Sequence, residues 1–162
     1  MGSTATGIFS AMVSAVNAHA GPADAGAPPQ YRAMGSLEEL LQSGPQDRGF
    51  TVRPATGGAM MQVQTTSAGA GETQNWVDID LVVKLINEGR SEADFGAVIS
   101  EEIFSMTNRV LSYFRNSGNV TSGDVDEITS DAWTLDHDED SVRVWVVTGR
   151  FRVWWTQTAL TT

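Results

Sequence analysis

The sequence predicts an α+β fold: one mainly antiparallel sheet with helices packed on one face. Segments in which apolar and polar residues alternate with period two outnumber the segments with helical periodicity. Most of the alternating segments follow one another through hairpin links, which join antiparallel strands. With 162 residues the chain is long enough for one domain, 1–162, with its own hydrophobic core.

The longest alternating segment, residues 141–157, is predicted to be a strand near the centre of the sheet. Its sequence, SVRVWVVTGRFRVWWTQ, is rich in β-branched and aromatic residues, which suit a pleated surface. Because both faces of this strand are largely apolar, we place it centrally, with Arg143, Arg150 and Arg152 reaching its rims. Gly149 indicates a bulge or the close approach of another segment. The residues expected on its buried face are Trp145, Val147, Phe151, Val153 and Trp155.

Two amphipathic helices are predicted. In residues 4–18, apolar residues recur at helical spacing, and the following Gly-Pro pair is a stop signal. In residues 91–116, an apolar stripe runs from Phe95 to Phe114, and Ser91 is placed to cap the first turn. Both stripes are interpreted as core faces, and a contact of the first helix with a partner subunit is the alternative.

The segment between these helices begins with an unusual composition. Residues 20–36 are rich in Ala, Gly and Pro, so a long mobile loop is expected there. Ser36 and Glu39 form a capping box, which predicts a short helix. A short strand at 49–54 should follow.

Hairpins account for the remaining strands. Segments 60–65 and 76–86 are predicted to pair, with a projecting hairpin loop at 65–75. A second hairpin should join a strand at 126–137 to the central strand through the acidic turn 138–140.

Composition excludes several function classes. The chain has a net charge of -10, which argues against a protein that grips nucleic acid through phosphate contacts. It has no cysteine, which excludes disulfides, thiolate catalysis and cysteine metal sites. The N-terminus lacks a basic region before its apolar residues, and no apolar run approaches the ~20 residues of a membrane helix. We therefore expect a soluble protein, made in a cytoplasm and not bound to a membrane.

No catalytic, cofactor or metal site is predicted from motifs. The acidic run Asp136–Asp140 resembles the start of a calcium loop, but Ser141 and Val147 stand where that loop needs Gly and Glu. Asp78 and Asp80 share a strand face, where they fit either an acid–base pair or a solvated surface. The glycine-rich segments lack the Lys-Ser/Thr of a phosphate loop. An enzyme is therefore the least favoured class.

Adjacent tryptophans stand at the end of the central strand. Trp154 and Trp155 must point to opposite faces, so one can fill the core. The other is covered by a helix or contacts a partner, as tryptophan often does in interfaces.

The order of these elements resembles the tail-terminator proteins of long-tailed bacteriophages, which have counterparts in phage-like gene transfer particles. The resemblance rests on the helix at 4–18, a hairpin ending in NWVDIDLVVKL, a helix starting SEADF and a last hairpin ending in VRVWVVTGRFRVWWTQ. It covers residues 75–157 and the first helix, and the chain departs from the family by its insert at 20–36.

The resemblance implies a structural protein of the virion, in its tail or neck, that is assembled in the host cytoplasm. Such subunits form a ring, usually a hexamer, on the head-proximal end of the tail tube. The ring ends tube polymerisation and contacts the head connector or stopper protein, and DNA passes through its lumen without specific binding. The alternatives are a head-completion or stopper protein of the neck, or a non-viral ligand-binding α+β domain with a concave apolar pocket.

A ring needs a contact between two different patches of the same subunit. Arginines and acidic residues of the predicted hairpins are candidates for such patches, or are ordinary surface. On this hypothesis, reversing the charges of Arg150 and Arg152 should spare folding and impair ring formation. The interface candidates are Arg143, Arg150, Arg152, Trp154, Asp78, Asp80, Asp138 and Asp140.

Overall fold

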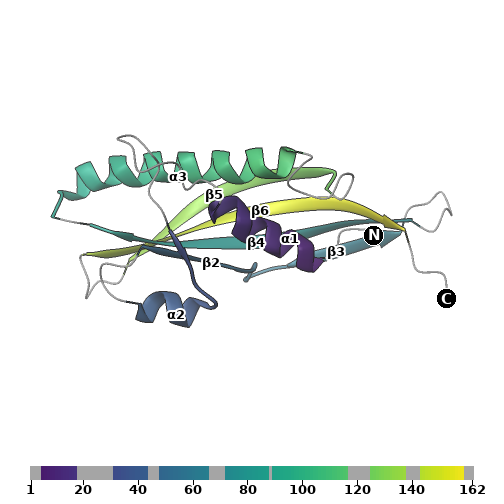
Figure 1. Ribbon diagram of the computed structural model, residues 1–162, viewed down its shortest axis with the longest axis horizontal. Coiled ribbons are helices and arrows are strands. Elements are labelled where there is room, and N and C mark those ends of the chain that lie inside the picture. The colour runs from purple at the N-terminus through teal and green to yellow at the C-terminus, as the bar shows by residue number, and fades with distance from the viewer. Residues whose placement is uncertain are drawn as a thin grey trace.

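The computed structural model describes residues 5–17, 31–43, 48–65, 72–87, 89–116, 125–137 and 143–158. These ranges contain three helices and six strands (Figure 1). The elements in chain order are α1 (Ala5–Asn17), β1 (Arg32–Ala33), α2 (Leu37–Gln42), β2 (Gly49–Pro54), β3 (Met61–Thr65), β4 (Glu72–Ile86), α3 (Glu92–Arg115), β5 (Glu127–His137) and β6 (Val144–Thr158).

The sheet confirms the predicted α+β class. Its strand order is β1-β2-β4-β6-β5, and all of these pairs are antiparallel except β1 with β2. β3 pairs with β4 beyond the end of β2, so β2 and β3 follow one another along the same edge of β4. β6 lies between β4 and β5, which confirms the central position predicted for this segment.

The two long helices cover one face of the sheet, as expected (Figure 1). Alternate residues of β6 point into this layer, and Phe95 of α3 meets Trp145 edge to face with ring centroids 5.5 Å apart. Val77 and Ile79 of β4 are fully buried in the same core. The predicted apolar stripes of both helices are therefore core faces.

The short helix α2 lies on the opposite face, which the sequence did not predict (Figure 1). Leu40 of α2 and Met34 pack on Val82 of β4 in a small second cluster, with Val146 beside it. β4 explains this placement. Because Leu81, Val82 and Val83 follow one another in the strand, both faces of the sheet carry apolar residues that a helix can cover. We call this the open face, because α2 covers only part of it.

Both predicted helix caps are present. The Ser91 hydroxyl accepts a hydrogen bond from the backbone N–H of Asp94 at 3.2 Å. The Ser36 hydroxyl accepts one from the N–H of Glu39 at 3.1 Å, and the Glu39 carboxylate accepts from Gly35 at 2.8 Å. In a capping box the Glu39 carboxylate would accept from the N–H of Ser36; here it accepts from the residue before it, Gly35.

Two predicted loops are shorter than expected. Arg32 and Ala33 fall in the expected loop 20–36 but form β1, because they pair with Gly49 and Phe50. Residues 72–75 fall in the expected hairpin loop 65–75 but belong to β4, because the β6 ladder continues to Glu72 opposite Thr158. Residues 18–30, 66–71 and the acidic turn 138–140 lie outside the described residues. Of the helices in the described ranges, none is long and apolar enough to cross a membrane.

Another segment comes close to Gly149, which was one of the two expectations for this glycine; the other was a bulge. A Cβ atom at this position would lie 2.3 Å from the ring of Trp133 on β5. The irregular pairing lies on the partner strand, between Ser130 and Trp133. The indole is held in place by a 3.0 Å hydrogen bond from its Nε1 to the Thr107 hydroxyl of α3 and by edge contact with Phe151.

Gly149→Ala should therefore destabilise the chain. A methyl group would overlap the Trp133 ring, and overpacking of this kind costs about 1–3 kcal/mol in the free energy of unfolding. Gly96→Ala is the matched control, because Gly96 lies in α3 with nothing near its Cβ position, and alanine there should be neutral or stabilising. Urea denaturation measures both. Equal stability of the two variants would contradict the close contact.

Candidate functional site

Two ion pairs cross the open face from β4 to β6. The register places Asp78 opposite Arg152 and Asp80 opposite Arg150. Arg152 donates to Asp78 from Nε at 2.7 Å and from Nη2 at 2.9 Å. Arg150 donates to Asp80 from Nε at 2.9 Å and from Nη2 at 3.2 Å. Both pairs are therefore bidentate, which is the strongest geometry for guanidinium and carboxylate.

Burial differs between the partners of each pair. Asp78 and Asp80 are 5% and 4% exposed, whereas the side chains of Arg150 and Arg152 keep 36% and 39% of their surface in solvent. Hydrogen bonds to the carboxylates raise the pKa of both arginines above its ordinary value, although partial burial lowers it. A buried carboxylate is costly without such a partner, so the arginines permit the aspartates to be buried.

Aromatic rings extend this arrangement along the open face. The Arg152 guanidinium lies 3.7 Å from the centroid of the Trp76 ring and 5.9 Å from that of Trp154. The indole Nε1 of Trp76 donates to Gln62 of β3 at 2.5 Å. These contacts hold Trp76 and Arg152 in fixed orientations. The arginine–tryptophan ladder is the set Trp76, Asp78, Asp80, Arg150, Arg152 and Trp154.

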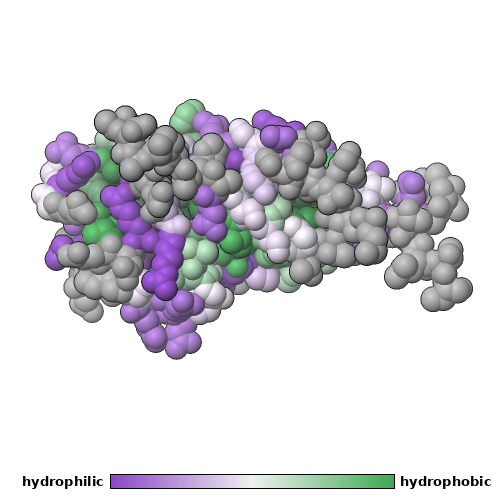
Figure 2. Space-filling view, in the orientation of Figure 1, coloured by the Kyte–Doolittle hydropathy of each residue, from purple (hydrophilic) through white to green (hydrophobic). Residues whose placement is uncertain are grey.

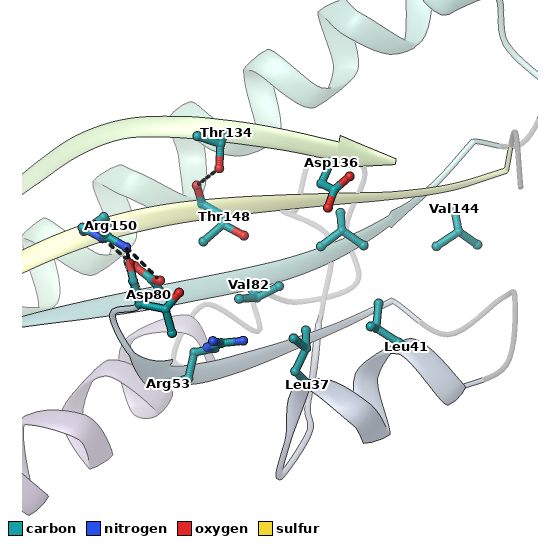
Figure 3. Close-up of a pocket in the computed structure, with 12 residues that line it drawn as sticks. Leu37, Leu41, Arg53, Asp80, Val82, Thr134, Asp136, Val144, Thr148 and Arg150 are labelled. Carbon is teal, nitrogen blue, oxygen red and sulfur yellow. Dashed lines mark hydrogen bonds and ion pairs between the residues drawn. The ribbon is translucent and has the colours of Figure 1, made fainter. Parts of the chain in front are cut away.

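A groove lies beside the ladder on the same face (Figure 3). Its volume is about 630 Å³. Leu37 and Leu41 of α2 stand on one side, and Thr134 and Asp136 of β5 on the other. The remaining lining residues are Arg53, Thr56, Asp80, Val82, Val144, Val146, Thr148 and Arg150.

Helix α2 is amphipathic: its apolar side lines the groove, and its polar side faces the solvent. Leu41 lines the groove and is 55% exposed, and Leu40 is fully buried beneath the helix. Glu38, Glu39 and Gln42 occupy the other positions, and Figure 2 shows hydrophilic residues on the part of α2 turned to the viewer. The open face thus combines apolar surface, aromatic rings and paired charges, which are features of protein interfaces.

The structure revises several placements inferred from the sequence. Arg150 and Arg152 do not reach the rims of the sheet; they stand on the open face in its middle, because residues 148–154 alternate strictly. Asp78 and Asp80 are not on a solvated face, because these arginines cover them. Arg143 is exposed directly before β6, and Asp138 and Asp140 lie outside the described residues.

The two tryptophans take the two alternatives that the sequence left open. Trp155 is 2% exposed and belongs to the core beneath the helices. Trp154 lies on the open face and is half-buried beside Arg152. Whether Trp154 or the ladder contacts another subunit stays a prediction.

A polar cluster on the helix side was missed by the sequence analysis. The Tyr31 hydroxyl donates to the Glu102 carboxylate of α3, and Arg48 lies 3.7 Å from the other oxygen of Glu102. Burial raises the pKa of Tyr31 and lowers that of the nearby Arg109, which is 5% exposed. Within the described residues the Nε of Arg109 has no hydrogen-bond partner. This cluster fastens the segment before β1 to α3.

In the part of the chain that the structure describes, no group of three or more His, Cys, Asp or Glu side chains is arranged to hold a metal ion. Comparison with known proteins gives no identification: no protein-family model matches the chain, and no curated protein matches it at a significant level.

The Asp78–Arg152 pair changes the effect expected of mutations at these arginines from loss of assembly to loss of stability. Arg152→Gln should lower the free energy of unfolding by about 1–3 kcal/mol, because it leaves a buried carboxylate without its partner. The lower part of that range applies because the Arg152 side chain is 39% exposed. Reversal of Arg150 and Arg152 would place carboxylates beside Asp80 and Asp78, so it should destabilise folding rather than spare it.

Arg143→Gln is the matched control. Arg143 is exposed, so its replacement should change stability by no more than about 0.5 kcal/mol. In a double-mutant cycle with Asp78→Asn, the two changes should be less than additive. If Arg152→Gln proves as harmless as the control in urea denaturation, the pair does not stabilise the sheet.

Proposed function

We propose that the chain is a structural protein of a tailed virion, of the tail-terminator type. Copies of it form a ring, with the hexamer as the expected number, on the head-proximal end of the tail tube. The ring ends tube polymerisation and joins the tail to the connector or stopper protein of the head. The protein is then located in the neck of the virion after assembly in the host cytoplasm.

The order of the elements carries this proposal. The resemblance to tail terminators rests on an N-terminal helix, a hairpin, a long helix and a final hairpin. The chain has α1, the β3–β4 pair, α3 and the β5–β6 pair in that order. β1, α2 and β2 lie between the first helix and the first hairpin, and the departure from the family noted above, the insert at 20–36, falls in the same interval.

The charge of the chain fits the proposed path of DNA. A net charge of -10 on each subunit would give a ring a negative field. Phosphates are repelled by such a surface, so DNA would pass through the lumen without binding. This argument supports a passage role and does not distinguish a terminator from a stopper protein, which remains the nearest alternative.

The groove favours a second class of function, a non-viral ligand-binding domain. Its volume of about 630 Å³ lies within the range of small-molecule sites, roughly 300–1,000 Å³. Val82, Val144 and Val146 give it an apolar lining, and Arg53 offers a charge for orientation. A protein of this class would be a monomer or a dimer and would bind its ligand without a tail tube.

The test is the mass of the purified chain in solution, alone and mixed with tail tubes from the same particle. The proposal predicts a ring-sized species, or binding at one end of each tube, with loss of further tube growth. Electron microscopy of the mixture shows where the protein binds. An unrelated acidic protein of similar size is the control for charge effects.

A monomer that ignores the tubes would contradict the proposal. Attention would then move to the groove, where Leu41→Asp should abolish binding of an apolar ligand. Leu41 is 55% exposed, so this change should spare the fold.

A further inference from the structure

The exposed large hydrophobic residues are not scattered over the molecule. Among the described residues there are six, of which only Leu41 belongs to the groove. Met60, Met61 and Val63, exposed by 41%, 38% and 60%, lie on β3 or directly before it. Phe104 and Leu135, exposed by 70% and 52%, lie on α3 and β5.

Phe104 and Leu135 belong to the same side of the molecule. Phe104 precedes Thr107 by one helical turn, and the Thr107 hydroxyl accepts a hydrogen bond from Trp133 of β5. Leu135 follows Trp133 by two residues, so both project from the same face of β5. The apolar residues thus gather at two places, β3 and the β5 side of α3.

These two places lie on opposite edges of the sheet; on the β3 side, the short strand β1 pairs with Gly49 and Phe50 at the start of β2. Among the described strands, β3 pairs only with β4, and β5 pairs only with β6. Each therefore presents one row of backbone N–H and C=O groups away from the sheet. Such an edge accepts a strand from another chain unless something blocks it.

The two edges also differ in charge. Residues 48–65, which include β2 and β3, carry Arg48 and Arg53 and no acidic residue. Residues 125–137, which include β5, carry Asp126, Glu127, Asp131 and Asp136 and no lysine or arginine. In a chain with a net charge of -10, this edge is a local exception, with Arg48 paired to Glu102 of α3 and Arg53 beside the groove.

We propose that the β2–β3 edge of one copy binds the β5 edge of a second copy of this chain. The exposed apolar residues of the two edges come together, and the acidic β5 edge faces an edge whose charged residues are Arg53 of β2 and Arg48 directly before it. This inference rests on the proposed ring and names the surfaces that would build it.

The pairing has a defined direction. Every neighbouring pair from β3 through β4 and β6 to β5 is antiparallel. A second copy in the same orientation therefore presents β3 antiparallel to β5, and the alternation of strand direction continues across the contact. The contact joins two different patches, so repetition builds a ring or an open filament rather than a closed pair.

Charge disfavours the symmetric alternatives. Two β5 edges brought together would oppose carboxylates to carboxylates, which is repulsive at short range. Acidic residues on an edge strand also act against pairing with unrelated strands. The β3 strand, Met61–Thr65, has no charge of its own and accepts the β5 edge without this repulsion.

Disulfide cross-linking tests the contact, because the chain has no cysteine. Val63→Cys and Leu135→Cys are made in separate chains, mixed in equal amounts and oxidised. The proposal predicts mixed dimers well in excess of the dimers that either variant forms alone. A double variant, with both changes in one chain, should give a ladder of covalent multimers that ends at the ring size.

Leu41→Cys is the matched control for cysteine exposure. Leu41 is as exposed as Leu135 but lies in the groove, so its mixture with Val63→Cys should give only background cross-linking. Equal yields in both mixtures would overturn the contact. Dimers formed as readily by one variant alone would also overturn it, because they indicate a symmetric interface.

Charge reversal gives a second measurement that does not depend on oxidation. Arg53→Glu should weaken self-association by about tenfold, the order expected from a new like charge at an interface. If Arg53→Glu leaves the dissociation constant unchanged, the β2 arginine is not at the contact.

The mass of the wild-type chain separates this inference from the proposed function. A ring whose Val63→Cys and Leu135→Cys variants do not cross-link would overturn the edge contact and leave the ring intact. A chain that stays monomeric at its highest soluble concentration and does not cross-link overturns the contact in solution. Binding to tail tubes then decides the proposed function by itself.

Discussion

The pairing of β4 with β6 is the constraint on which the rest of the structure depends. The two strands, of 15 residues each, pair from Glu72 opposite Thr158 to Ile86 opposite Val144. This register brings Ile79 beside Phe151 under the helices and Asp78 beside Arg152 on the open face. A slip of one strand by a residue would turn its charges toward the helices and its core residues toward the open face. These two ion pairs, whose carboxylates are buried, therefore help to specify the register as well as to stabilise it.

Local patterns were enough to predict most of the elements. The caps at Ser36 and Ser91 depend on residues three positions away, and the alternation in β6 is visible within the strand itself. The ion pairs depend on residues 70 and 74 positions apart, so no local pattern reveals them. A signal was present: the D-x-D of β4 and the R-x-R of β6 have the same spacing and opposite charge. It becomes informative only once these strands are placed side by side.

The side of the sheet taken by α2 is a similar case. Its amphipathic pattern predicts a buried side but not which face of the sheet buries it. Lys84 of β4 decides this in part: it is 1% exposed and donates to the hydroxyl and the carbonyl of Ser43, at the end of α2, at 2.5 and 3.1 Å. Tyr31 and Glu102 fasten the chain to α3 on the other face in the same way. Such long-range polar contacts position the segments that the hydrophobic pattern leaves undetermined.

The ion pairs on the open face affect where a partner would bind, because their charges are already paired within the subunit. Arg150 and Arg152 already donate hydrogen bonds to Asp80 and Asp78. A partner that bound these arginines instead would leave buried carboxylates without hydrogen bonds, which costs free energy. The ladder can offer the faces of Trp76 and Trp154 to a partner, but little net charge. The sheet edges differ in this respect, since their backbone groups and apolar side chains lose nothing within the subunit when a second chain covers them. On the proposed arrangement, the edge contact involves Arg53 and the acidic β5 edge at the sides of the groove, and leaves Trp76, Trp154 and the valines of the groove free for a different partner.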